Sequence, residues 1–184
     1  IFNRLDSSGV HVWRIDAGGG SPRKLTSGAG EQNPFLSRDG LYFIASHYDS
    51  PRKVSVLSTD DGHVVLERSD VSGSLGFSPD SRSVMLASPG KDERGLTVAV
   101  YSVYPIAGGP PTTSFRRPEQ ALGIVWAPDG QAFTYRNRTD PAWNVYRQAF
   151  EGGPPVAVTH FAQGRVISHN WSPDGRRLVA RVEE

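Results

Sequence analysis

The side chains in this sequence best suited to metal binding or acid–base chemistry are its five histidines, His11, His47, His63, His160 and His169. No two of them stand two or four residues apart, and no His-Glu-x-x-His motif is present, so their spacing does not fit a metal site on one strand or helix. The chain contains no cysteine, which excludes thiolate zinc sites, a cysteine nucleophile and disulfides. We therefore expect neither a metal site nor a cofactor.

A serine nucleophile also lacks its usual setting. The closest string to a nucleophile elbow, Gly73-Ser74-Leu75-Gly76, lacks the glycine two residues before the serine. Four aspartates recur at intervals of 41, 49 and 45 residues: Asp39, Asp80, Asp129 and Asp174. Catalytic carboxylates must act together within a few ångströms, whereas residues that recur once per repeat are held apart. We expect these aspartates to close turns, and we expect no enzymatic activity.

The turn that carries these aspartates is the first of two repeated motifs. It reads Ser37-Arg38-Asp39-Gly40, Ser78-Pro79-Asp80-Ser81, Ala127-Pro128-Asp129-Gly130 and Ser172-Pro173-Asp174-Gly175. Proline, aspartate and glycine suit a tight turn, and an apolar run follows each copy. The second motif is a glycine-rich turn after an alternating strand, as at Gly18-Gly19-Gly20, Gly108-Gly109 and Gly152-Gly153. The two motifs alternate, so each repeat contains four short strands, which we label A to D, with the first turn joining A to B and the second joining C to D.

A four-stranded repeat of about 45 residues predicts an all-β fold, a β-propeller of four-stranded blades. The spacing predicts three full blades at about 33–67, 73–115 and 122–158. Residues 1–26 supply strands B, C and D of an earlier blade, and residues 166–184 supply strands A and B of a later one. Residues 1–184 thus form a single propeller domain or a fragment of one. No stretch of 11 or more residues keeps a helical period without a glycine or proline, so no helix is expected.

Three segments carry a family resemblance: Phe77-Ser78-Pro79-Asp80, Trp126-Ala127-Pro128-Asp129-Gly130 and Trp171-Ser172-Pro173-Asp174-Gly175. They resemble the PD40 (WD40-like) repeat of TolB-like propellers, and are similar to propellers fused to bacterial receptor-like kinases and regulators. Arg38 in place of the turn proline and Ser81 in place of the turn glycine depart from that pattern. The resemblance implies a scaffold or sensor, located mostly outside the cytoplasm. Some propellers of the family that these repeats resemble are the non-catalytic lids of prolyl-oligopeptidase-like enzymes.

Candidate ligand-binding residues are polar or aromatic side chains on one predicted face of the propeller, where the B–C and D–A connections emerge. They are His47, Tyr48, Arg136, Arg138, Trp143, His160 and His169. His47 and Tyr48 begin one B–C connection, and residues 136–142 form another. His160 lies in a D–A connection, and His169 lies on an A strand.

Two functions remain open. The first is a non-catalytic binding or sensor scaffold that presents loops to a protein, peptide or saccharide. The second is the substrate-gating propeller of a prolyl-oligopeptidase-like serine peptidase whose catalytic domain is absent from this chain. Lysine and arginine total 20 and acidic residues 19, which gives no reason to expect nucleic acid as a partner. No run of 18 apolar residues is present, so this segment is not expected to insert into a membrane.

The strand count bears on self-association. The pattern predicts about four blades, at the lower end of the range for propellers. We expect further blades, supplied by absent sequence or by a second copy of the chain.

Overall fold

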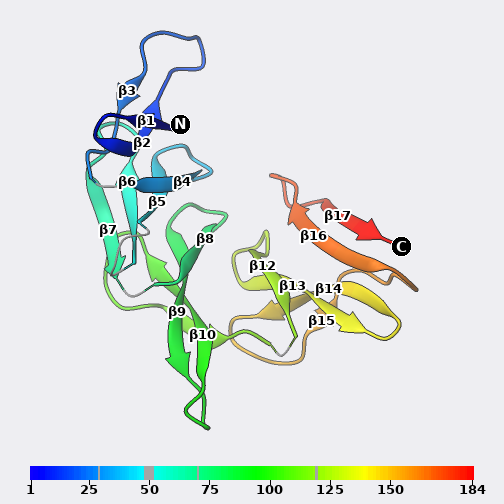
Figure 1. Cartoon of the computed structure of the whole chain (residues 1–184). Helices are drawn as coiled ribbons and strands as arrows, with labels where there is room; N and C mark the ends of the chain where they lie inside the picture. The colour runs from blue at the N-terminus through cyan, green and yellow to red at the C-terminus, as the bar shows by residue number, and fades with distance from the viewer. Residues whose placement is uncertain (29, 48–51, 70, 119) are drawn as a thin grey trace. The chain divides into compact units, whose positions relative to one another are not determined.

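The computed structural model describes residues 1–28, 30–47, 52–69, 71–118 and 120–184 (Figure 1). Seventeen strands form five antiparallel sheets, and the described residues contain no helix. No described segment is therefore a helix able to cross a membrane. The all-β prediction is confirmed.

The strands follow one another within each sheet in chain order. The first sheet contains β1 (Phe2–Asp6), β2 (Gly9–Arg14) and β3 (Arg23–Lys24). The second contains β4 (Glu31–Leu36), β5 (Tyr42–His47), β6 (Lys53–Ser58) and β7 (Val64–Ser69), and the third contains β8 (Gly73–Phe77), β9 (Ser83–Lys91), β10 (Thr97–Pro105) and β11 (Thr113–Arg116). The fourth contains β12 (Leu122–Trp126), β13 (Ala132–Thr139), β14 (Ala142–Ala149) and β15 (Val156–Ala157), and the fifth contains β16 (Arg165–Trp171) and β17 (Leu178–Glu183). Three four-stranded sheets with a three-stranded and a two-stranded one match the predicted full and partial blades.

The repeated aspartates close turns, as the sequence predicts. The Asp39 carboxylate accepts hydrogen bonds from the Ser37 hydroxyl at 2.7 Å and the Leu41 amide at 3.0 Å. Asp80 accepts the same two kinds of bond, from the Ser78 hydroxyl and the Arg82 amide. The hydrogen bond from the Ser78 hydroxyl is the main reason that the pKa of Asp80 lies below its ordinary value. These carboxylates are committed to their own turns.

The chain forms two compact units, Ile1–Ser114 and Phe115–Glu184. In the first unit, the β4–β7 sheet has a hydrophobic core on each face. One core joins it to the β1–β3 sheet and contains Val12, Leu25, Phe43, Ala45 and Leu57. The other joins it to the third sheet and contains Ile44, Val54, Val56, Leu66, Val71, Phe77, Val84, Leu86 and Ile106. Burial on both faces explains why β5 begins as a continuous apolar run, Tyr42-Phe43-Ile44-Ala45.

Aromatic rings fill the core of the second unit. Phe133 stacks on Phe115 with ring centroids 4.2 Å apart, and the edge of Trp126 meets Phe150 at 5.4 Å. Trp126 is only 8% exposed, as expected for an anchor of blade packing. The apolar run that follows the last repeated turn is not buried throughout, because Val179 is 69% exposed. Among the described strands β17 pairs with β16 alone, so the outer edge of β17 has no strand partner.

Candidate binding cleft

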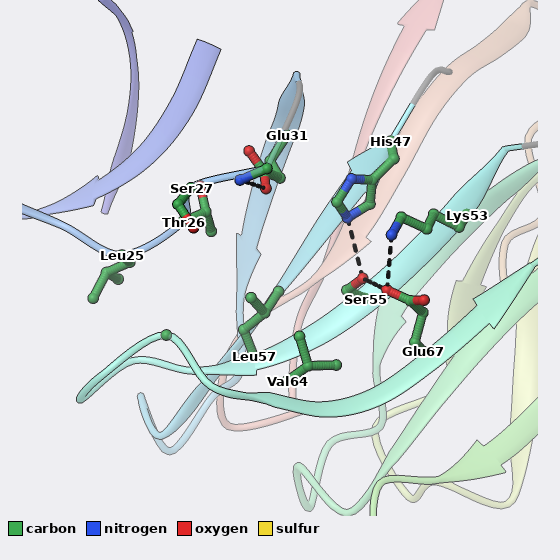
Figure 2. A pocket seen from close by; sticks show the side chains of 12 residues that line it. Leu25, Thr26, Ser27, Glu31, His47, Lys53, Ser55, Leu57, Val64 and Glu67 are labelled. Atoms are coloured by element: carbon green, nitrogen blue, oxygen red, sulfur yellow. Dashed lines mark hydrogen bonds and ion pairs between the residues drawn. The ribbon is translucent and has the colours of Figure 1, made fainter. Parts of the chain in front are cut away.

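A cleft of about 380 Å³ opens in the first unit, between the segment that follows β3 and the face of strands β5 to β7 (Figure 2). The residues lining it come from both neighbouring sheets. They are Leu25, Thr26, Ser27, Gly28, Glu31, His47, Lys53, Ser55, Leu57, Gly62, Val64 and Glu67.

The cleft follows from the shortness of β3. This strand has only two residues, after which the chain leaves the sheet and passes through residues 25–30 to β4. The turn between β6 and β7 meets this segment at Gly62, whose φ is 79°. A Cβ at Gly62 would lie 1.9 Å from the Leu25 carbonyl oxygen. Glycine is therefore required here both for its backbone conformation and for the close approach.

One end of the cleft is a hydrogen-bonded network across three strands (Figure 2). The Ser55 hydroxyl on β6 donates to Oε2 of Glu67 on β7 at 3.0 Å, and the ammonium of Lys53 donates to the same oxygen at 3.1 Å. Nε2 of His47, the last residue of β5, lies 3.1 Å from the Ser55 hydroxyl oxygen. Ser55 and Glu67 are register partners, and Lys53 precedes Ser55 by two residues, so the pleat places these side chains on one face.

The charge of this network is set by its contacts. The hydrogen bond from Lys53 is the largest influence that lowers the pKa of Glu67, and the Ser55 hydroxyl and the charges of Lys53 and His47 add to it. Glu67 is therefore a carboxylate at neutral pH. Both Glu67 and Lys53 are partly open to solvent, with 42% and 38% of their side chains exposed, so a molecule in the cleft can reach them.

A second carboxylate lines the opposite wall. Glu31 is only 4% exposed, and its Oε1 accepts a hydrogen bond from the Gly28 amide at 2.9 Å. Leu25, Leu57 and Val64 line the apolar part of the cleft, and Val64 is 52% exposed. The cleft therefore combines apolar side chains with two carboxylates and one ammonium group.

His11 is 1% exposed and contacts Glu31 through Nδ1 at 3.3 Å. Nε2 of His11 lies 2.9 Å from the Ser8 hydroxyl oxygen. Glu31, His11 and Ser8 therefore contact one another in the same order as the carboxylate, imidazole and hydroxyl of a catalytic triad. The Ser8 hydroxyl, however, donates to Asp6 at 2.6 Å, and Lys24 donates to the other oxygen of Asp6. The serine proton is thus directed to a carboxylate instead of the imidazole, and the group ties the first hairpin to β4.

The structure separates the predicted binding residues. His47 lies in the cleft, and Tyr48 lies outside the described residues. His160 is exposed, and Arg138 is exposed and paired with Asp140 at 2.7 Å.

Arg136, Trp143 and His169 come together in the second unit. Thr134 and Arg136 alternate along β13 on the face that meets β16, because Thr134 lies 3.0 Å from Nε2 of His169 and Arg136 donates to the Val166 carbonyl at 3.2 Å. Burial, with a smaller contribution from the Arg136 charge, lowers the pKa of His169 to about 4. His169 is therefore neutral at pH 7. Within the described residues no group of three histidine, aspartate or glutamate side chains suits a metal ion.

Comparisons with solved structures bear on the fold. TolB from Acinetobacter baumannii superposes with a TM-score of 0.61 at 16% identity, over 93% of this chain and 42% of TolB. Acylaminoacyl peptidase from Pyrococcus horikoshii gives 0.63 at 16% identity, over 92% of this chain and 30% of the enzyme. The Cps50 (Swd1) β-propeller domain of Myceliophteria thermophila gives 0.54 at 11% identity, over 83% of this chain and 50% of that one. The fold is a β-propeller.

The propeller spans between 30% and 50% of these three chains. No protein-family model matches the sequence, and no curated protein is a significant match. The structural likeness supports a TolB-like propeller fold and reaches no further, because TolB and a peptidase share it.

Proposed function

We propose that this propeller is a non-catalytic binding module for a protein or peptide partner, and that the cleft beside β5–β7 receives a basic side chain of that partner. The observation that carries the proposal is the composition of the cleft: apolar walls beside a partly exposed carboxylate. A lysine side chain has the matching form, an apolar stem that ends in a cation.

The charge balance favours a cation. The cleft carries the negative charges of Glu31 and Glu67 and the positive charge of Lys53. Its net formal charge is therefore −1 when His47 is neutral. Glu67 uses Oε2 for both Lys53 and Ser55. Among the described residues its Oε1 has no hydrogen-bond or ion-pair partner, so this oxygen is available to a ligand.

The same contacts argue against catalysis. Ser55 is the hydroxyl of the cleft closest to an imidazole, but the residue is 1% exposed and its hydroxyl donates to Glu67. A nucleophile must approach the carbon that it attacks, which a buried hydroxyl between two strands does not do. These facts support a recognition role for the chain.

Titration of the ¹⁵N-labelled chain with n-butylammonium, which mimics a lysine side chain, tests the proposal by NMR. We expect the amide signals of Ser55 and Glu67 to shift, and butyrate, with the same chain length and the opposite charge, to leave them in place. Glu67→Gln should weaken butylammonium binding about threefold, the range of a partly exposed ion pair. Glu93→Gln, at an exposed turn between β9 and β10, is the matched control. Equal binding of butyrate, or an unchanged affinity in Glu67→Gln, would refute the proposal.

The alternative function is that of a gating propeller of a serine peptidase. TolB and the peptidases share the propeller fold, and no feature of this chain favours the gating role. An extracytoplasmic location belongs to our proposal and rests on the resemblance of the repeats to TolB-like propellers. Self-association also belongs to it. It is supported by β17, whose outer edge has no strand partner among the described residues and whose Val179 is exposed.

Further strands, from sequence beyond this chain or from a second copy, would cover that edge. Light scattering separates these sources, because a dimer that persists on dilution requires the second copy and a monomer refutes it.

A further inference from the structure

Three side chains of the second unit meet at the end of the sheet where β13 turns into β14. Arg136 and Trp143 lie on neighbouring strands of the fourth sheet, on the face directed to β16, and Arg165 begins β16. The Trp143 amide donates to the Gly164 carbonyl at 3.0 Å, which fixes the start of β16 beside β14. The guanidinium of Arg165 lies over the Trp143 ring, 5.4 Å from its centroid.

Arg136 is half-buried, yet its charge is not neutralised within the described residues. Its Nη1 donates to the Val166 carbonyl, while its Nε is buried and lacks a hydrogen-bond partner. No described carboxylate lies within ion-pair distance of Arg136 or of Arg165. Burial is the main cause that lowers the pKa of Arg136, and the positive charge of Arg165 adds to it. A buried cation without a counter-charge is costly unless something pairs with it.

The other charged groups nearby do not compensate. Asp140 is paired with Arg138, and Glu183, the register partner of Arg165, is paired with Arg181 at 2.7 Å. His169, also directed at this face, is neutral at pH 7 because its pKa is lowered to about 4. Among the described residues, the positive charges of Arg136 and Arg165 therefore have no opposing carboxylate, and Arg165 lies over the Trp143 ring.

Gly123 on β12 gives the Arg136 side chain its place. The φ of Gly123 is 62°, and a Cβ there would lie 2.9 Å from both Nε and Nη2 of Arg136. The guanidinium of Arg136 thus lies against the backbone of β12, in space that a larger residue at position 123 would occupy.

We propose that Arg136 and Arg165 form a carboxylate-binding site for an acidic peptide, with Trp143 as its apolar floor. Guanidinium groups recognise carboxylates bidentately, and arginine stacked on an aromatic ring remains available at its edge. Two cations at one spot suit a single carboxylate better than a row of phosphates, and the net charge of the chain is only +1. The site uses no residue of the cleft in the first unit, so it stands or falls independently of the function proposed above.

The test uses capped hexaglutamate as the probe and capped hexaglutamine as its uncharged counterpart, with binding to the full chain measured by calorimetry at low salt. We expect hexaglutamate alone to bind, and to bind more weakly as salt is raised. Arg165→Gln, at an exposed position, should weaken binding about threefold, the range of an exposed ion pair. Arg136→Gln, at a half-buried position, should weaken binding about tenfold, as expected for a lost charge-assisted hydrogen bond. Arg176 lies in the turn between β16 and β17, at the end of the fifth sheet opposite to Arg165. The Arg176→Gln variant should bind hexaglutamate as the unaltered chain does.

Three results would overturn the site. They are equal binding of hexaglutamine, unchanged affinity in Arg165→Gln, and an equal loss in Arg176→Gln, which would indicate general attraction to a basic surface. Arg165→Gln decides the matter even if Arg136→Gln fails to fold, because the Arg165 side chain is exposed and forms no hydrogen bond within the described residues.

Discussion

Acid should weaken this protein through His169. The unfolded imidazole binds a proton with a pKa near 6.5, whereas burial and Arg136 lower the pKa of the folded one to about 4. Between these values the unfolded state binds more protons, so the free energy of unfolding falls as pH falls. Each pKa unit corresponds to about 1.4 kcal/mol, so the loss between pH 7 and pH 4 is roughly 3 kcal/mol. Below about pH 3 both states are protonated and this contribution no longer changes.

Urea unfolding followed by tryptophan fluorescence at pH 7, 6, 5 and 4 measures the effect. Other groups also titrate, so the informative quantity is the difference between the unaltered chain and His169→Gln, which keeps a polar partner for Thr134. We expect the variant to lose about 3 kcal/mol less stability across this range. His160→Gln, an exposed histidine of the same unit, is the control and should follow the unaltered chain. Parallel curves for His169→Gln and the unaltered chain would show that this reasoning is wrong.

Five further substitutions test the packing and the turns. Gly62→Ala should cost at least about 2 kcal/mol more than Gly40→Ala in urea unfolding, because both have positive φ but only Gly62 meets a backbone oxygen; equal losses would contradict the close approach to Leu25. Trp126→Ala should cost roughly 3–5 kcal/mol of stability, the range for emptying a large buried site. Trp171→Ala should cost about 2 kcal/mol at most, because Trp171 is half-buried. The reverse order in thermal melts would show that Trp126 is not the better buried of the two. Asp174→Ala should cost about 1 kcal/mol through the lost hydrogen bond from the Arg176 amide, and no change in the urea midpoint would show that this bond does not contribute.

Ser81 illustrates how far local rules reach. The repeat predicts a turn at this position even though serine replaces glycine, and the residue adopts a φ of 61°, close to the 76° of Gly40. The Ser81 hydroxyl accepts a hydrogen bond from the Asp39 amide at 3.3 Å in the preceding repeat. The sequence predicts the turn, but only the packing of one repeat on the next supplies this partner.

The candidate sites were less accessible to sequence reasoning. His47 was predicted from its place at a loop, but its link to Glu67 runs through Ser55 and across three strands. The contact between His11 and Glu31 joins two sheets through residues 20 positions apart, and no sequence motif predicts it. No sequence pattern singles out Arg165, because it is an isolated arginine whose role depends on Trp143 and Arg136.

The sequence alone determined the number and order of the strands and the turns between them. Those features depend on residues a few positions apart, such as Asp39 with Ser37 and Leu41, and on a period that repeats along the chain. The tertiary structure decided which side chains share a cleft, which charges remain unopposed and which strand edge lacks a partner. Such properties arise where one sheet packs on the next, because side chains distant in sequence then set one another's burial and charge.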